Sequence, residues 1–268
     1  MKREKKIIGI IAFMSFIILN ILGLFITINM LENNEANATN EPINKNILKE
    51  KIDYTVESSS SQIKNLDRAI AITFDDGPNE ITTPKILDIL KRKNIQATFF
   101  MLGENVSRNK EIVKRIFDSG HEIGNHSFSH RQLTLLSDEE IKNEINDTDR
   151  EIRKITGINP NYIRPPYGSV NKNIAKIGKR PIIEWSVDSR DWQSKNKESI
   201  INEVKNQVYP GSILLFHDIQ EATVEALPEV IDYLYSQNYK LVTIGQLLQS
   251  PKQVVNYYGI DDNKQIDE

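Results

Sequence analysis

The 268-residue sequence predicts an α/β fold built on a largely parallel sheet. Between residues 66 and 250, short apolar runs alternate with longer amphipathic segments, which is the pattern of repeated β/α units. Clusters of polar residues directly follow several of the apolar runs. Since parallel α/β folds place their sites at the carboxyl ends of strands, these clusters are candidates for one common site.

Apolar runs and helical periodicity divide this part of the chain into its elements. The predicted strands span residues 69–74, 97–101, 122–124, 182–187, 212–216 and 240–243. The predicted helices span residues 83–93, 110–119, 138–156, 197–207 and 222–237. Asn94 and Gly120 occupy positions typical of C-terminal caps, and Ser137 with Glu140 forms a capping box at the start of the third helix.

The N-terminus carries a different signal. Four basic residues within positions 2–6 precede an uncharged apolar run over residues 7–31, and about 20 such residues span a bilayer. The positive-inside rule then predicts a single-pass anchor, residues 1–31, with everything after it outside the cell. A cleaved signal peptide is the alternative, because Ala36-Asn37-Ala38 resembles a cleavage site, although the apolar run exceeds the usual core of about 7 to 15 residues.

The segments beside the folded region are polar. Residues 32–65 are rich in Asn, Glu, Lys and Ser and have no apolar periodicity, which predicts a flexible stalk. Residues 251–268 form a polar acidic tail without a strand or helix pattern, and we expect it to be solvated. One folded domain, residues 66–250, remains between them.

Composition excludes several classes of function. The chain has no cysteine, so disulfides, thiol nucleophiles and thiolate metal sites are excluded, and a metal would need His, Asp or Glu ligands. A formal net charge of -3 without a basic stripe argues against a nucleic-acid partner. No feature of the sequence indicates a protein partner.

Two adjacent carboxylates, Asp75 and Asp76, follow the first strand in the motif Thr-Phe-Asp-Asp-Gly-Pro. Neighbouring strand side chains point to opposite faces, so the Gly-Pro turn must redirect at least one of them if both serve one site. Taken alone, the motif is more typical of a turn than of a catalytic element.

Three of the four histidines lie within residues 121–130. His126 and His130 are four residues apart, a spacing that lets two imidazoles bind one cation. A carboxylate and an open position would complete a catalytic zinc site, and that carboxylate could be Asp75 or Asp76. Zinc proteases have Glu directly after the first His, whereas Ser127 stands here, so a peptidase is disfavoured. His121 is expected to serve the start of a strand and not the metal.

Three further clusters follow predicted strands or turns, at residues 164–168, 188–192 and 214–218. Singly, they are explained by an exposed proline turn, a charged loop around a tryptophan and a histidine that closes a buried strand. Together they supply a cation, a carboxylate, an aromatic wall and a fourth His, which is the inventory of a hydrolytic metal site.

In order, these motifs read Thr-Phe-Asp-Asp-Gly-Pro, His-Ser-x-x-His, Arg-x-Pro-Tyr, Asp-x-x-Asp-Trp and Leu-x-His. The set resembles the five motifs of carbohydrate esterase family four, the polysaccharide deacetylases, from about residue 69 to residue 243. The resemblance implies a distorted, incomplete (β/α) barrel of mostly parallel strands.

Residue by residue, the resemblance implies a role for each matching position. Asp76, His126 and His130 would bind the metal, Asp75 would be the catalytic base, and His217 would be the acid. The remaining residues would support these groups or bind substrate. Arg164 would hold Asp75 ionised and oriented, and Asp191 would pair with His217. Trp192 and Leu215 would line the pocket for the acetyl methyl group. The backbone N–H of Tyr167 would donate a hydrogen bond to the oxyanion.

The implied activity is metal-dependent removal of N-acetyl groups from a polysaccharide, with acetate released. The outward-facing anchor favours N-acetylglucosamine of peptidoglycan as substrate, and the ligand set suits zinc, with cobalt, manganese or nickel as alternatives. A chitooligosaccharide deacetylase or an acetylxylan esterase would use the same centre. If the chain were a non-catalytic wall-binding protein on this fold, we would expect substitutions at the metal-binding residues or at Asp75. The sequence keeps all of these residues.

The predicted topology has a direct test. Protease added to intact protoplasts should remove the folded domain, because the orientation of the anchor places that domain outside, and immunoblotting before and after lysis measures the removal. Full protection in protoplasts, with digestion after lysis, would contradict the topology.

Overall fold

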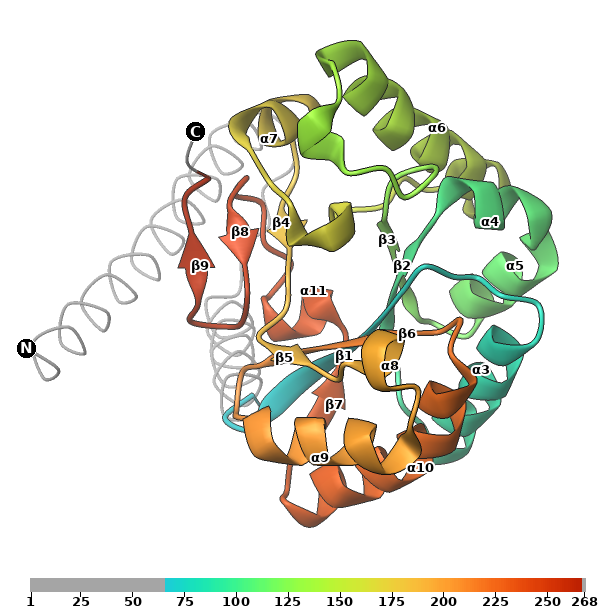
Figure 1. The fold of residues 1–268 in the computed structure, drawn as a ribbon, viewed down its shortest axis with the longest axis vertical. Helices are drawn as coiled ribbons and strands as arrows, with labels where there is room; N and C mark the ends of the chain where they lie inside the picture. The colour runs from blue at the N-terminus through green and yellow to red at the C-terminus, as the bar shows by residue number, and fades with distance from the viewer. Residues whose placement is uncertain (1–65, 267–268) are drawn as a thin grey trace, which may run out of the picture. The chain divides into compact units, whose positions relative to one another are not determined.

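The computed structural model describes residues 66–266 (Figure 1). The predicted anchor and stalk, residues 1–31 and 32–65, lie outside the described residues, as do residues 267 and 268. Within residues 66–266 we find no helix with the length and apolar character that a membrane crossing requires.

The described chain alternates strands and helices in the order drawn in Figure 1. The strands are β1 (Ala69–Asp75), β2 (Thr98–Met101), β3 (Glu122–Asn125), β4 (Ile182–Ile183), β5 (Val187–Asp188), β6 (Ile213–His217), β7 (Lys240–Val242), β8 (Asn256–Tyr257) and β9 (Asn263–Lys264). The α-helices are α3 (Thr82–Lys93), α4 (Gly103–Arg108), α5 (Lys110–Asp118), α6 (Asp138–Thr156), α7 (Lys172–Gly178), α8 (Asp191–Ser194), α9 (Lys197–Gln207), α10 (Glu221–Ser236) and α11 (Ile244–Leu247), with 3-10 turns η1 (Leu133–Leu135) and η2 (Pro166–Gly168).

The predicted parallel sheet is confirmed. Its strand order is β3-β2-β1-β6-β5, with β7 also paired to β1, and all of these pairs are parallel. Single parallel bridges at Ile163 continue the ladder from Asn125 to Ile182 in β4, which pairs with β8 in a second, three-stranded sheet. Because β4 and β5 belong to different sheets, the arrangement is consistent with the expected distorted, incomplete barrel.

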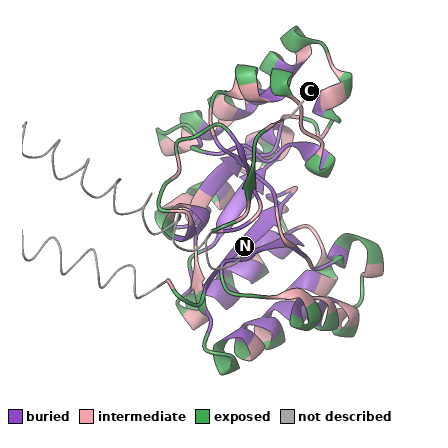
Figure 2. Ribbon diagram, turned by 90° about the vertical axis from the view of Figure 1, so that its left-hand side faces the viewer, coloured by how far each residue is buried: buried purple, intermediate pink, exposed green. Residues whose placement is uncertain are grey.

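The central strand β1 has two different faces, as the two-residue period of a strand requires. Ile70, Ile72 and Phe74 belong to the larger core, which the outer helices cover, whereas Ala69 and Ala71 belong to a separate core cluster with Phe100 and Ile183. Figure 2 shows the strands as the buried layer and the helices with their outward sides exposed. Thr73 and Asp75 share the face of Ala71, so β1 directs them into the barrel interior.

An aromatic cluster supports the strand ends from the other face. Phe74 stacks on Phe99 with ring centroids 5.0 Å apart and meets Phe216 at 5.9 Å. These rings come from β1, β2 and β6, and two of them directly precede Asp75 and His217 in sequence. Burying one such side chain contributes about 1.5–3 kcal/mol, so this cluster fixes the strand ends on which the polar groups stand.

Local signals predicted the longer helices well. The bounds of α6 and α9 agree with the prediction, Ser137 and Glu140 form the expected capping box, and Asn94 caps α3 with φ of 52°. Gly120 lies one residue beyond the C-cap of α5, which is Ser119. The prediction missed α4, α7, α8 and α11, because helices of four to seven residues are too short for a clear amphipathic pattern.

Two predictions about strands and tail are wrong. Residues 182–187 do not form one strand, because the chain passes from the second sheet into the first between β4 and β5. In this connection the N–H of Glu184 donates to the backbone carbonyl of Tyr257 in β8. The expectation that residues 251–268 are solvated fails at β8, since Val255 and Tyr257 are buried beside β4. A two-residue strand is too short for alternation to reveal it.

Candidate active site

The sequence motifs meet at the carboxyl end of the parallel sheet. Asp75 ends β1 and His217 ends β6, and the two residues are register partners. His126 follows β3 directly, and Arg164 follows the bridge residue Ile163. Strands far apart in the chain therefore carry these side chains to one place.

Arg164 lies inside the barrel with no exposed surface. Its Nη1 donates to Asp75 Oδ1 at 2.7 Å and to Thr73 Oγ1 at 2.8 Å, and its Nε and Nη2 donate to backbone carbonyls of β4 and Glu184 at 2.9 and 3.0 Å. The structure thus places Arg164 on Asp75, as the resemblance implied. Residues 164–166 are buried, so the alternative explanation of this motif as an exposed proline turn is wrong.

Asp76 reaches the same site through its backbone conformation. A continued strand would turn its side chain to the outer face, but its φ is 74°, in the left-handed region. Asn105 Nδ2 donates to the Asp76 carbonyl at 2.8 Å. Gly77 is required next, because a Cβ there would lie 2.1 Å from Oδ2 of the buried Asp218. The turn therefore redirects one of the two carboxylates, as the sequence predicted.

Asp76, His126 and His130 form a group that can hold a cation. Asp76 Oδ1 lies 3.4 Å from His126 Nε2 and 3.3 Å from His130 Nε2, and this oxygen is buried without a hydrogen-bond partner. Ligand atoms about 2.0–2.1 Å from a tetrahedral zinc are about 3.3 to 3.4 Å apart, so these distances fit one divalent ion. The choice left open between the two carboxylates falls on Asp76, while Asp75 Oδ2 stands 3.7 Å from His126 Nε2.

The charges of this group are strongly coupled. Burial alone would raise the pKa of Asp76, but the adjacent His126 and then the other neighbouring imidazoles, His217 and His130, lower it to about 2. Burial opposes a charge on His126, yet the carboxylates of Asp75 and Asp76 outweigh it and raise the pKa of His126. Burial and the nearby His126 lower the pKa of His130. The site therefore concentrates negative charge where a cation or a proton can bind.

The loop between the two histidines is held by a residue that the sequence analysis missed. Glu144 of α6 is buried and accepts hydrogen bonds from the backbone N–H of Phe128 and Ser129 and from the Ser129 hydroxyl, at 2.8, 2.9 and 2.6 Å. A signal was available, because Glu144 lies on the face of α6 that buries Ile141 and Ile145. A carboxylate on a buried helix face needs polar partners.

His217 has a buried carboxylate partner, Asp191. Asp191 Oδ1 lies 2.7 Å from His217 Nδ1, and Oδ2 accepts from the His217 N–H at 2.7 Å and from the Thr223 hydroxyl at 2.5 Å. Burial would lower the pKa of His217, but the hydrogen bond and charge of Asp191 raise it to about 9. The imidazole is therefore protonated at neutral pH and keeps Nε2 for another partner.

The three expected substrate contacts lie on this side of the molecule. Leu215 is two residues before His217 in β6 and so shares its face, with 3% of its surface exposed. Trp192 follows Asp191 and is 50% exposed, and Tyr167 in η2 is 66% exposed. Large exposed aromatics beside a polar site are available for contact with a ligand.

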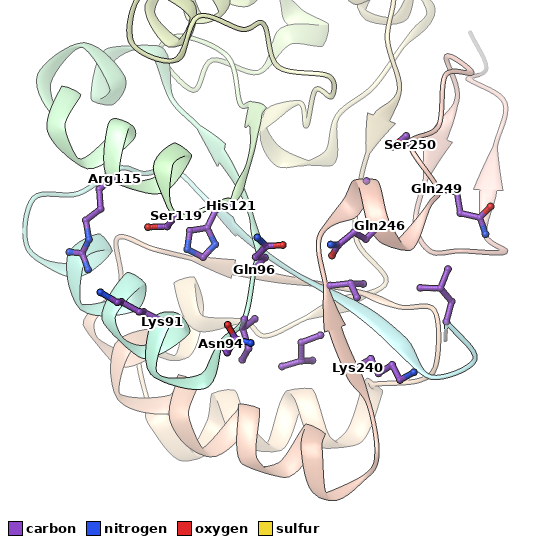
Figure 3. A pocket seen from close by; sticks show the side chains of 15 residues that line it. Lys91, Asn94, Gln96, Arg115, Ser119, His121, Lys240, Gln246, Gln249 and Ser250 are labelled. Carbon is purple, nitrogen blue, oxygen red and sulfur yellow. The ribbon is translucent and has the colours of Figure 1, made fainter. Parts of the chain in front are cut away.

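His121 lies at the other end of β3, as expected from the sequence. Its Nδ1 accepts a hydrogen bond from the Ala97 N–H at 3.1 Å, and burial with the nearby Arg115 lowers its pKa to about 4. It lines a cavity of about 1310 Å³ between the α3–β2 connection, α5, β7 and α11 (Figure 3). None of the candidate site residues lines this cavity, so its size does not identify the reactive centre.

The chain is similar in sequence to known proteins. The family model described as Polysaccharide deacetylase matches residues 62–181. The peptidoglycan-N-acetylglucosamine deacetylase PgdA of Listeria monocytogenes is 43% identical over 192 residues, which are 72% of this chain and 41% of that protein. This chain thus spans less than half the length of that curated relative.

Solved structures show the same fold. The peptidoglycan deacetylase PdaC from Bacillus subtilis is 44% identical, with a TM-score of 0.67 over 69% of this chain and 91% of that chain. BA3943 from Bacillus anthracis, described as a pseudoenzyme of the CE4 family, is 30% identical, with a TM-score of 0.65 over 75% of this chain and 70% of that chain. Likeness of fold alone therefore does not establish catalysis, and the intact site residues carry that argument.

Glu144 provides a test of how the loop between His126 and His130 supports metal binding. Glu144→Ala removes the acceptor of three donors, and we expect it to weaken zinc affinity by roughly 10- to 100-fold, because outer partners orient metal ligands. Stability should fall by about 1–3 kcal/mol, since three partly buried donors lose their acceptor. Calorimetric zinc titration and thermal unfolding measure the two effects.

The matched control is Glu139→Ala, an exposed carboxylate on the same helix. It should leave zinc affinity unchanged. Unchanged affinity in Glu144→Ala as well would show that the loop holds its shape without this carboxylate.

Proposed function

The chain belongs to the polysaccharide deacetylase family, and on that premise we propose that it removes N-acetyl groups from N-acetylglucosamine residues of peptidoglycan. One observation carries the proposal: the possible metal group of Asp76, His126 and His130 is flanked by Asp75 and by the His217–Asp191 pair. The names of the relatives PgdA and PdaC support the substrate class.

Deacetylases of this family are metal-dependent, and this chain has a possible Asp-His-His site. We propose zinc as the ion, since two imidazoles, one carboxylate and an open position are typical of catalytic zinc, although cobalt, manganese and nickel suit the same donors. When bound, the ion supplies Lewis acidity toward the amide carbonyl.

Asp75 is suited to act as general base. Its Oδ1 is held by Arg164 and Oδ2 is left on the side of His126, 3.7 Å from Nε2. A carboxylate fixed in this way can take the proton of the attacking water. Arg164 is a positioning residue in this scheme, because it lies behind Asp75 in the barrel and has no exposed surface.

His217 is suited to act as general acid. Its Nδ1 is bound to Asp191, so the proton on Nε2 is the one available to the departing sugar amine. Its pKa of about 9 keeps that proton in place at neutral pH. The backbone N–H of Tyr167, presented by a left-handed turn, is the proposed donor to the oxyanion.

We further propose that Leu215 and Trp192 bound the acetyl methyl group. Leu215 shares the strand face of His217, and Trp192 directly follows the partner of His217. Localisation on the outer side of the membrane, with a secreted form as alternative, is proposed from residues 1–31 alone.

The function is tested by acetate release from purified peptidoglycan, chitin oligomers and acetylated xylan, with and without chelator. We expect release from peptidoglycan that chelator abolishes and added zinc restores. Preference for chitin oligomers or xylan would favour the sister activities. Binding of peptidoglycan without acetate release would favour a non-catalytic wall protein.

The two adjacent carboxylates should behave differently. Asp75→Asn removes a proton acceptor but no ligand, so it should bind zinc and fail to turn over. Asp76→Ala removes one of three protein ligands, so it should bind zinc poorly, and excess zinc should restore part of its activity. Calorimetry and acetate release distinguish the two. If both variants lost zinc equally, Asp75 would also be a ligand. If Asp75→Asn were fully active, Asp75 would not be the general base.

Loss of His217 should affect the reaction and spare the metal. His217→Ala should retain near-normal zinc content and lower turnover by roughly 100-fold or more, the usual range for a lost general acid. In the unmodified chain, turnover should decline as pH rises through the pKa of His217, because the neutral imidazole has no Nε2 proton to give. Elemental analysis and a pH–rate profile provide the measurements, and zinc lost together with His217 would contradict the ligand assignment.

A further inference from the structure

We propose that the phenol of Tyr167 positions His130, so that an exposed side chain sets how tightly this chain holds its cation. The inference rests on the proposed metal site and assigns a role to a side chain whose backbone alone enters the proposed reaction. Tyr167 Oη lies 3.1 Å from His130 Nδ1, and the two rings meet edge to face with centroids 4.7 Å apart.

The two histidines of the site are supported in different ways. His126 is buried, and its Nδ1 lies 2.6 Å from the backbone carbonyl of Arg164. A carbonyl only accepts, so this contact places a proton on Nδ1, and the neutral ring then has its Nε2 lone pair available for a cation held together with Asp76. His130 has a side chain that is 28% exposed, and the partner of its Nδ1 is the Tyr167 hydroxyl. The second imidazole thus depends on a side chain where the first depends on the main chain.

The same tautomer is needed at both positions. His130 Nε2 faces Asp76 Oδ1 at 3.3 Å, so its lone pair serves a cation only when Nδ1 carries the proton. Tyr167 Oη then accepts that proton in a hydrogen bond. An accepting group on the outer nitrogen fixes the ring orientation and makes the inner nitrogen a better ligand.

Tyr167 is exposed, yet its turn is firmly placed. Its φ is 65°, and Pro165 and Pro166 before it are buried. The hydroxyl of Ser169 lies 2.9 Å from that of Thr134, in the turn that follows the histidine loop. The turn therefore presents the phenol to His130 from a defined direction.

This placement joins two tasks in one residue. The backbone N–H of Tyr167 is the proposed oxyanion donor, and its hydroxyl orients a metal ligand. A single turn thus aligns the group that receives the carbonyl oxygen with the group that holds the cation. If Tyr167 served only as an aromatic surface for substrate, its hydroxyl would not affect cation affinity.

The test is zinc affinity of the full chain with Tyr167→Phe, which keeps the ring and the backbone and removes only the hydroxyl. Calorimetric titration of metal-stripped protein should show affinity weakened by roughly 10- to 100-fold. The matched control is Tyr209→Phe, a tyrosine that is 41% exposed after α9, and it should bind zinc as the unmodified chain does. With saturating zinc, Tyr167→Phe should recover most of its turnover, because the N–H of residue 167 remains.

A second readout follows the imidazole directly. Nitrogen NMR of the zinc-loaded chain should show protonated Nδ1 on both His126 and His130, and Tyr167→Phe should shift the His130 signal and leave that of His126. Equal zinc affinity of Tyr167→Phe and the unmodified chain would overturn the proposal, as would an unmodified chain that binds no zinc. Weakened zinc binding in a chain that releases no acetate would uphold the role of Tyr167 and refute the proposed activity.

Discussion

The structure depends most on one buried cation, the guanidinium of Arg164. It is removed from water in the barrel interior, and its donors are used by Thr73, Asp75 and the carbonyls of Ile183 and Glu184. Its own backbone donates to the Asn125 carbonyl and accepts from His126 Nδ1. One residue therefore joins β1, β3 and β4 and sets the orientation of Asp75, the proposed base, and of His126, a proposed metal ligand. Removing one partner of such a buried pair costs about 3–5 kcal/mol, a large part of the roughly 5–15 kcal/mol that holds a typical domain folded.

Around this cation, the site is shaped by backbone conformations that side chains disfavour. Asp76, Ser127, His130 and Tyr167 all have positive φ. Each such residue costs on the order of 1–3 kcal/mol and persists only where the surroundings hold it. Here Asn105, Glu144 and the aromatic cluster beneath the strand ends do so. The backbone of Asp76 redirects a side chain that a continued strand would send outward, and Asp76 thereby comes close enough to His126 and His130 for the three to hold one metal ion.

Two ion pairs of opposite sense, Arg164–Asp75 and Asp191–His217, end close to the group of Asp76, His126 and His130. The cation of Arg164 compensates the negative charge of Asp75. The carboxylate of Asp191 compensates the positive charge of His217. Burial opposes a positive charge on His217, and the hydrogen bond and charge of Asp191 outweigh that effect. The proposed proton acceptor, Asp75, and the proposed proton donor, His217, thus lie at register-paired strand ends.

The amino-acid sequence by itself determined the parallel α/β fold, the bounds of α6 and α9, and the candidate ligands at strand ends. These follow from local periodicity, capping and turn chemistry, which act between residues close in the chain. Residue types and spacing left Asp75 and Asp76 open, and the structure places Asp76 with the two histidines, in agreement with the family resemblance. Only the tertiary structure decided that residues 182–187 divide between two sheets and that β8 is buried. It also supplied the partners Thr73, Glu144, Thr223 and the Tyr167 hydroxyl. Their hydrogen bonds join residues 91, 16, 32 and 37 positions apart, and no local pattern encodes such pairs, because they form only when packing brings distant strand ends and helix faces together.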